Sequence, residues 1–347
     1  MKALFFISLT ILLLSYITPA QLDQCDGPKT TTLPFAGDYG GAGSLGVTRQ
    51  IIVNPDPDAP APVSVFIPSN ASLTNKVPVI FFSHAYGAFD FRLYEDLLRQ
   101  LASRGYAVVY SPYSTSITVD HPKRYNQLWG GFTIAVQQFG GVLDTTRVGF
   151  AGHSFGAGAT PEMARRGANA GWGANGLFLF VMAPWYNWGS NMEQVPATAK
   201  MIVQVYWDDA VNQHLIAQND VWNRLPQIIE RKWQVIRAAQ TYCALNAGHS
   251  VPTTGSLGSS DGVFNGYDAW GVGRRIDALA AYTFTGSQAA KNVAFGVDAK
   301  MGRWRGQFAV RPIPPLETYD APLVNMQTVP TFLWSERCNF AQGLPCP

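Results

Sequence analysis

Residues 147–160 read Arg-Val-Gly-Phe-Ala-Gly-His-Ser-Phe-Gly-Ala-Gly-Ala-Thr, and most of what the sequence predicts depends on them. Val148–Ala151 is an apolar run typical of a buried strand, and the residues after Gly156 favour a helix. Between them, Gly152-His153-Ser154-Phe155-Gly156 has the form G-x-S-x-G. In a nucleophile elbow the serine takes a strained backbone conformation at the strand end, and the glycines let strand and helix pass closely. The alternative is a glycine-rich loop with a solvated serine. Because a strand precedes and a helix follows, we interpret Ser154 as a nucleophile, which needs a base, an orienting acid and an oxyanion hole.

Length and composition limit the class of protein. The chain has 347 residues, 47% of them hydrophobic, which suits one large α/β domain or two small ones. Only 14% of residues are charged, the formal net charge is +2, and no Lys/Arg run occurs. We therefore expect no nucleic-acid partner. The 13% of aromatic residues fits a protein that binds apolar or neutral ligands. We expect a monomer.

The N-terminus predicts a secretory signal peptide over residues 1–20. Lys2 gives a positive start, Leu4–Ile17 is apolar, and Thr18-Pro19-Ala20 offers a cleavage site after Ala20. The alternative is an uncleaved anchor, but the apolar run is short for a membrane span, and no other segment is apolar enough. We expect a secreted or extracellular protein, periplasmic if the source is Gram-negative.

The cysteines fit the same compartment. Four of them, Cys25, Cys243, Cys338 and Cys346, remain after the signal peptide, which favours two disulfides. Three connectivities are possible. The short spacing favours Cys338–Cys346, which leaves Cys25–Cys243 as the remaining pair. Asn70-Ala71-Ser72 is a glycosylation sequon in a eukaryotic secretory route. The five histidines lack metal-ligand spacing, so we expect no metal and no cofactor.

The order of apolar segments predicts a mostly parallel sheet. Val47–Val53 and Val63–Ile67 are expected to form an antiparallel pair at the sheet edge. Val77–Phe82, a helix over Phe91–Ser103 and Tyr106–Tyr110 form a βαβ unit. Further strands are expected at Val148–Ala151, Gly176–Met182, Lys200–Tyr206 and, as the last one, Lys232–Ile236, with helices at His121–Phe139 and Val211–Leu225.

These segments predict an α/β fold with helices on both faces of the sheet and an irregular C-terminal extension. We place the catalytic core at residues 21–254. Residues 255–347 are expected to contribute one helix near Trp270–Tyr282 and an extension that packs on the core.

Candidate partners for Ser154 follow other predicted strands. Asp208 and Asp209 follow one strand, and His249 follows the last. In a parallel sheet the carboxyl ends of strands lie at one edge, where ligands bind. The order Ser, Asp, His is that of the α/β-hydrolase triad. Because adjacent side chains diverge, only one aspartate can be the acid. We favour Asp209, since Asp209-Ala210-Val211 looks like the loop after the acid in that fold, with Asp208 as the alternative.

Backbone N–H groups are expected to form the oxyanion hole. One belongs to Phe155, and the other to Tyr86 in the loop 84–88. Tyr86, Phe155 and Trp185, with Tyr186 and Trp188 as further candidates, would form an aromatic rim suited to an apolar or aromatic group.

Several segments resemble known esterases. Residues 82–89, Phe-Ser-His-Ala-Tyr-Gly-Ala-Phe, together with 101–106, Leu-Ala-Ser-Arg-Gly-Tyr, resemble the oxyanion segment of secreted platelet-activating-factor acetylhydrolases and chlorophyllases. Gly152–Gly156 is similar to the elbow of the acetylhydrolases. The elbow and Ala183-Pro184-Trp185 also resemble bacterial cutinase-like polyester hydrolases, which implies that Trp185 binds substrate. The position of Asp209 matches the polyester hydrolases better. The resemblance is good over about residues 77–215, loose over 216–252 and absent over the last ninety residues, and it implies a serine esterase of the α/β-hydrolase superfamily.

The expected function is hydrolysis of carboxylic esters through an acyl-enzyme. Ser154, Asp209 and His249 would act on a small-molecule ester, a lipid or a polyester with an apolar acyl or aromatic group. Amide or thioester hydrolysis would use the same groups. A different alternative is a catalytically silent protein of this fold that binds an apolar ligand or a protein partner.

Overall fold

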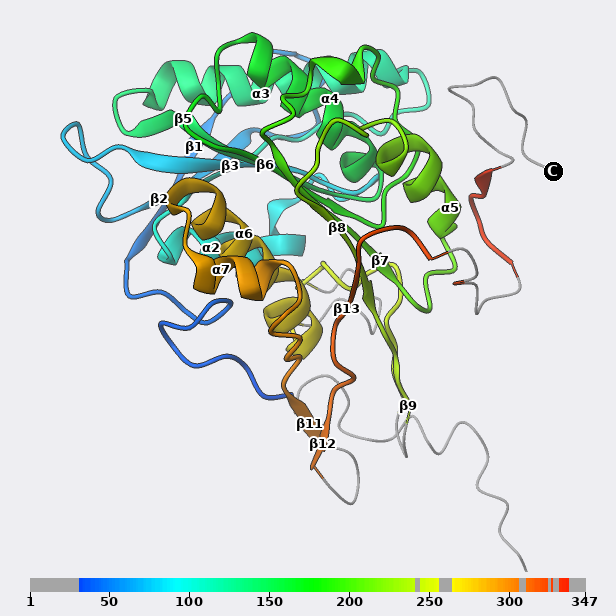
Figure 1. Ribbon diagram of the computed structural model, residues 1–347. Coiled ribbons are helices and arrows are strands. Elements are labelled where there is room, and N and C mark those ends of the chain that lie inside the picture. Colours follow the sequence, from blue (N-terminus) through cyan, green and yellow to red (C-terminus); the bar gives the residue numbers. More distant parts are fainter. Residues whose placement is uncertain are drawn as a thin grey trace, which may run out of the picture.

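One sheet organises the molecule, with nine strands in the order β1-β2-β4-β3-β5-β6-β7-β8-β13 (Figure 1). The structure is a computed structural model and describes residues 31–240, 244–255, 264–305, 310–323, 326 and 331–336. Neighbouring strands from β4 to β8 in this order are parallel, whereas β1, β2 and β13 join through antiparallel pairs. The strands of this sheet are β1 (Val47–Ile52), β2 (Val63–Pro68), β3 (Val77–Ser83), β4 (Ala107–Tyr110), β5 (Leu143–His153), β6 (Leu177–Met182), β7 (Lys200–Tyr206), β8 (Arg231–Ile236) and β13 (Glu317–Tyr319).

Helices cover both faces of the sheet, so the prediction of an α/β fold with a mostly parallel sheet is confirmed. In Figure 1, α3 and α4 lie above the sheet, and α2, α6 and α7 lie below it. The helical segments are η2 (Phe91–Tyr94), α2 (Glu95–Ser103), α3 (His121–Phe139), α4 (Phe155–Asn169), η3 (Met192–Gln194), α5 (His214–Ile216), η4 (Ala217–Trp222), η5 (Tyr267–Gly273), α6 (Arg274–Thr285) and α7 (Gln288–Ala294). Two short ladders complete the described elements: β9 (Ala239–Gln240) with β10 (Ala244–Leu245), and β11 (Arg303–Arg305) with β12 (Val310–Pro312).

Burial on both faces explains the apolar character of the central strands. All six residues of β6, Leu-Phe-Leu-Phe-Val-Met, are buried. One hydrophobic core includes Phe132 of α3 and Met163 of α4, and the other includes Leu97 of α2 and Ile276 of α6. A strand between two helical layers has no polar face, so it appears in the sequence as a continuous apolar run.

Local signals set the helix ends. Asp120 caps α3, because its Oδ1 accepts a hydrogen bond from Lys123 N at 2.8 Å. Gly286 ends α6 with φ of 72°, the left-handed conformation that glycine adopts without steric cost. The predicted helix His121–Phe139 is confirmed with those bounds.

The predicted helix Val211–Leu225 differs from the structure, which has only the short α5 and the π-helical η4 there. The amides of Val211 and Asn212 donate to Asp209 Oδ1 at 2.8 Å and 3.0 Å. The Gln213 amide donates to Trp334 O at 2.9 Å. Because these groups are bonded outside the helix, the helix begins only at His214.

The prediction that Lys232–Ile236 is the last strand is wrong. Strand β13 pairs antiparallel with β8 and adds a further edge strand. Glu317 Oε1 accepts from Arg237 Nε at 2.8 Å, and Lys232 pairs with Asp320, so charges hold the edge in place. A strand of three half-buried residues has no hydrophobic period that the sequence could reveal.

Met326 belongs to the hydrophobic core that contains Phe132, whereas most of the other buried apolar residues described beyond 254 belong to the core that contains Leu97. Ile276, Trp304 and Ile313 are buried there beside residues of β3 and β6. The helix predicted at Trp270–Tyr282 corresponds to η5 and α6. The described part of 255–347 therefore supplies helices, strand β13 of the main sheet and the β11–β12 ladder as well as irregular chain.

Several predictions lie outside the described residues. These are the signal peptide at 1–20 and both disulfides, since Cys25, Cys243, Cys338 and Cys346 all fall in undescribed segments. Asn70 of the sequon is exposed in the turn after β2.

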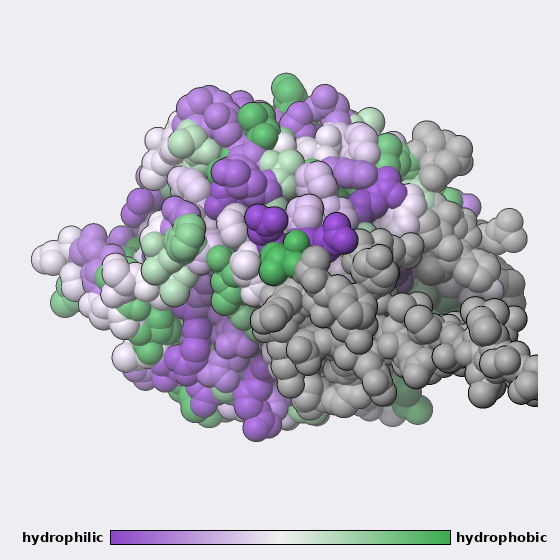
Figure 2. Space-filling view, turned by 90° about the horizontal axis from the view of Figure 1, so that it is seen from below, coloured by the Kyte–Doolittle hydropathy of each residue, from purple (hydrophilic) through white to green (hydrophobic). Residues whose placement is uncertain are grey.

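The described helices include none that is both long and apolar enough to cross a membrane. Figure 2 shows one face of the molecule, on which hydrophilic and hydrophobic residues are intermixed.

Candidate active site

Ser154 stands in a strained turn between β5 and α4. Its φ is 56° and its ψ is −119°, a backbone conformation that costs about 1–3 kcal/mol in a residue with a Cβ. Three backbone hydrogen bonds hold it: Ser154 N donates to Met182 O at 2.9 Å, and Ser154 O accepts from Gly158 N at 3.0 Å and Trp185 N at 2.9 Å. The surrounding chain thus fixes the conformation that the sequence predicted for a nucleophile elbow.

The two motif glycines are required by close backbone approach. A Cβ on Gly152 would lie 2.3 Å from Thr160 Oγ1. A Cβ on Gly156 would lie 2.1 Å from Ser83 O, at the end of β3. Neither clash is tolerable without movement of the backbone, so glycine at both positions lets α4 start directly against the sheet.

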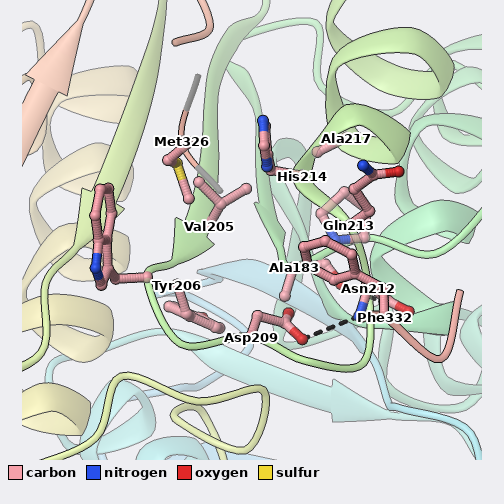
Figure 3. Close-up of a pocket in the computed structure, with 12 residues that line it drawn as sticks. Ala183, Val205, Tyr206, Asp209, Asn212, Gln213, His214, Ala217, Met326 and Phe332 are labelled. Carbon is pink, nitrogen blue, oxygen red and sulfur yellow. Dashed lines mark hydrogen bonds between the residues drawn. The ribbon is translucent and has the colours of Figure 1, made fainter. Parts of the chain in front are cut away.

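His249 is hydrogen bonded to Asp209. The distance from His249 Nδ1 to Asp209 Oδ2 is 2.8 Å, and Asp209 is only 6% exposed. Figure 3 shows Asp209 next to Asn212, whose backbone N–H donates to Asp209 Oδ1 at 3.0 Å. With the Val211 amide at 2.8 Å, this bond occupies Oδ1 and directs Oδ2 to the imidazole.

Asp208 has a different partner. Its Oδ2 accepts from Ala247 N at 3.0 Å, and its own amide donates to Ala247 O at 2.9 Å. Asp208 therefore holds the loop that carries His249, whereas Asp209 contacts the imidazole itself. Of the two acids that the sequence offered, the geometry favours Asp209.

Ser154 and His249 line one cavity of about 930 Å³. The hydrogen bond to Ser154 Oγ comes from Asn212 Nδ2 at 3.4 Å, and the same nitrogen donates to Ala183 O at 2.9 Å. Among the described residues, no hydrogen bond joins Ser154 Oγ directly to the His249 ring. Such bonds are often long in a free enzyme and shorten when substrate is bound.

The loop after β3 is fixed by a buried histidine. His84 Nδ1 donates to Ala85 O at 2.7 Å, and His84 Nε2 accepts from Tyr113 N at 3.2 Å. The His84 ring stacks on the Tyr113 ring at 4.1 Å. Burial lowers the pKa of His84 to about 3, so the ring is neutral at neutral pH and keeps the proton on Nδ1.

Two backbone amides of the cavity lining, those of Tyr86 and Phe155, are available as hydrogen-bond donors, whereas a third, that of Ala85, is not. The Ala85 amide is occupied, since it donates to Tyr94 OH at 3.2 Å. The amides of Tyr86 and Phe155, by contrast, donate to no acceptor within the described part of the chain. Phe155 begins α4, where backbone N–H groups lack a partner within the helix. Both residues line the cavity with Ser154.

His153, the second residue of the motif, connects three parts of the site. Its Nδ1 accepts from Tyr94 OH at 2.8 Å, and its Nε2 donates to His249 O at 2.8 Å. Burial, and secondarily the neighbouring His249, holds the pKa of His153 well below its usual range. A neutral His153 thus joins the loop after β3, through Tyr94 and the Ala85 amide, to the backbone of His249.

Aromatic side chains form the cavity wall. Trp185 lies 5.6 Å from Phe155, and Tyr86 meets Phe155 edge-on at 6.4 Å. His121, the first residue of α3, stacks on Trp188 at 4.4 Å and also lines the cavity. Tyr186 is fully buried behind Trp185.

His121 is held as a neutral ring. Arg124 Nη1 donates to its Nδ1 at 2.7 Å, and burial together with the Arg124 charge lowers its pKa to about 4. Arg124 is only 4% exposed and also donates to Ser114 O and Ser116 O at 2.9 Å. The wall therefore combines apolar rings with one buried cation bound to neutral acceptors.

The sequence did not identify four residues at this site: Asn212, His153, His121 and Trp334. His121 begins the predicted helix His121–Phe139, and a residue at a helix start can still face the carboxyl edge of the sheet. The other three have no local signal, because their roles depend on contacts between distant segments.

Comparisons with family models and with curated proteins identify no relative of this chain. No protein-family model matches it, and a search of curated proteins found no match. Within the described residues, no three His, Cys, Asp or Glu side chains converge as metal ligands would.

The buried histidines predict a loss of stability in mild acid. His84 and His153 stay neutral when folded but take up a proton when unfolded below about pH 6.5. Above that pH neither state binds the proton, so full stability is present. As the pH falls toward 4, each imidazole lowers the free energy of unfolding by up to about 1.4 kcal/mol per pH unit.

Urea unfolding of wild type and of His84→Asn between pH 7 and pH 4 tests this expectation. The variant should lose stability less steeply with falling pH. Tyr113→Phe, which removes the hydroxyl that donates to His84 O at 3.3 Å but keeps the imidazole and the ring stacked on it, should retain the wild-type slope. Equal slopes for wild type and His84→Asn would contradict the prediction.

Proposed function

We propose that this protein is a secreted serine hydrolase of the α/β-hydrolase fold that cleaves carboxylic esters. One observation supports this most. Ser154, held at φ 56° between β5 and α4, lines the same cavity as an imidazole that is hydrogen bonded to a buried carboxylate. A strained serine that lines a cavity, a base and an acid at one sheet edge are the requirements of nucleophilic acyl transfer.

The first half of the reaction forms an acyl-enzyme. Ser154 Oγ attacks the ester carbonyl carbon while His249 Nε2 accepts the hydroxyl proton. Asp209 keeps the other imidazole proton on Nδ1 and stabilises the imidazolium. The carbonyl oxygen becomes negatively charged and accepts from the Phe155 and Tyr86 amides, each worth roughly 3 kcal/mol in the transition state. His249 then gives its proton to the alcohol oxygen as the C–O bond breaks.

The second half releases the acid. Water attacks the acyl carbon, gives its proton to His249 and forms the same oxyanion in the same hole. The bond to Ser154 Oγ breaks, the proton returns to Oγ, and a carboxylic acid leaves. No cofactor takes part in these steps.

Apolar or aromatic esters are the substrates that this cavity suits. Phe155 and Trp185 are apolar walls close to the serine. Flat apolar groups gain area burial and ring contacts against such walls. We therefore propose substrates with apolar acyl or aromatic groups.

Fluorophosphonate labelling tests the proposal without a choice of substrate. We expect stoichiometric labelling of folded protein, with the adduct on the peptide that contains Ser154, together with turnover of p-nitrophenyl butyrate. Ser72, in the exposed turn before β3, should carry no adduct. A folded protein that takes no label and leaves the ester intact would instead be a binding protein of this fold.

A further inference from the structure

A C-terminal segment borders the candidate site. Leu333 N donates to Ala210 O at 3.0 Å, and Trp334 N donates to Val211 O at 2.8 Å. Gln213 N donates in return to Trp334 O at 2.9 Å, so Asn212 and Trp334 form a short parallel bridge. The loop that begins with Asp209 is thus paired, by backbone groups, with residues more than one hundred positions later in the chain.

Trp334 places its ring against the aromatic wall. Its ring meets that of Trp185 edge-on, with centroids 5.4 Å apart and planes at 81°. It also contacts Tyr186 at 6.4 Å, and Tyr186 OH donates to Ser335 O at 2.5 Å. Tyr186 OH therefore anchors the segment at a backbone carbonyl, while the indole of Trp334 contacts Trp185 and Tyr186.

The same two residues line the cavity. Leu333 and Trp334 border it together with Ser154, His249 and Trp185. Leu333 is 66% exposed, so it lies at the mouth, whereas Trp334 is half-buried. The wall of the cavity that contains Trp185 is therefore completed by a segment from the far end of the chain.

We propose that Trp334 determines specificity by limiting the size of the ester group that fits beside Trp185. The proposal rests on the proposed function, since it concerns the substrate of that site. The segment is anchored through its backbone amides and carbonyls, and these bonds do not involve the indole. Replacing Trp334 by alanine should therefore enlarge the cavity while the segment keeps its anchors.

The size of the effect follows from pocket energetics. One methylene in a hydrophobic pocket changes kcat/KM by about 10–200-fold. An indole occupies the space of several methylenes, so its removal should admit chains that wild type rejects. For Trp334→Ala we expect the kcat/KM ratio of p-nitrophenyl decanoate to p-nitrophenyl butyrate to rise by about tenfold or more. Trp334→Phe should give an intermediate ratio.

The experiment measures this ratio for wild type, both Trp334 variants and Trp172→Ala, all as full-length chains below the micelle concentration of each ester. A second series keeps butyrate as the acyl group and varies the alcohol, so that a limit on either side of the ester is detected. Trp172 is half-buried and stacks on Phe81 at 4.9 Å, outside the residues that line the cavity. Its variant controls for loss of a large aromatic ring, and its ratios should equal those of wild type.

Each outcome decides one statement. A shifted ratio in either series for Trp334→Ala, graded through Trp334→Phe and absent in Trp172→Ala, supports the proposal. Unchanged ratios in both series, in variants that still label with fluorophosphonate, overturn it and leave the proposed function intact. If wild type neither labels nor hydrolyses any ester, the proposed function fails, and the specificity role of Trp334 fails with it.

Discussion

Ser154→Ala is expected to lower kcat for p-nitrophenyl butyrate by on the order of 10⁴-fold or more. Without Oγ no acyl-enzyme forms, and only water activated by His249 could attack the ester. The Phe155 and Tyr86 amides remain in place, so substrate binding, and with it KM, should change little. Alanine keeps the Cβ and retains the three backbone hydrogen bonds at this position, so the elbow should keep its shape.

The matched control is Ser287→Ala. Ser287 caps α7, where its Oγ accepts from Ala290 N at 3.2 Å, and it lies outside the residues that line the cavity. Its loss should cost about 1 kcal/mol of stability and leave kcat within about twofold of wild type. If Ser154→Ala kept more than about one hundredth of wild-type activity after removal of contaminating esterases, the nucleophile would have to be sought elsewhere.

The central sheet and the elbow were predictable because their causes are local. A strand buried on both faces needs a continuous apolar run, and β3, β5 and β6 each contain one. The strained turn needs glycine at 152 and 156, and the clashes that a Cβ would make there explain why. Where a single physical requirement acts on neighbouring residues, the pattern can be read from the sequence.

The C-terminal half of the site was not predictable in this way. Trp334 reaches the cavity because its backbone pairs with the loop after β7, and that pairing leaves no period or motif in either segment. Strand β13 is too short to show alternation. The role of His153 depends on Tyr94 and on the carbonyl of His249, which approach it only in the folded chain.

The two neighbouring aspartates show the same division between local and distant causes. Their position after a strand was readable from sequence, but the direction of each side chain depends on its partners. Asp209 is bonded to His249, and Asp208 is bonded to the amide of Ala247. A pair of matched asparagine variants can therefore separate orientation of the base from support of its loop.

Asp209→Asn is expected to lower kcat by about 10⁴-fold. Asp209 Oδ1 accepts from the amides of Val211 and Asn212, so an asparagine would place its oxygen on these donors and its NH₂ toward His249 Nδ1. The imidazole would then carry its proton on Nε2 and could not accept the proton of Ser154. Substrate binding and the fold should be retained, so KM should change little.

Asp208→Asn should lower kcat by no more than about tenfold, because an amide oxygen can still accept from Ala247 N and the tautomer of His249 does not depend on it. Both variants are measured with p-nitrophenyl butyrate at pH 8, with fluorophosphonate labelling rates as a second readout that needs the same base. A strongly reduced kcat and labelling rate for Asp209→Asn, with near-wild-type values for Asp208→Asn, would assign the orienting role to Asp209. The reverse order would assign it to Asp208 and would mean that His249 changes its carboxylate partner when substrate binds.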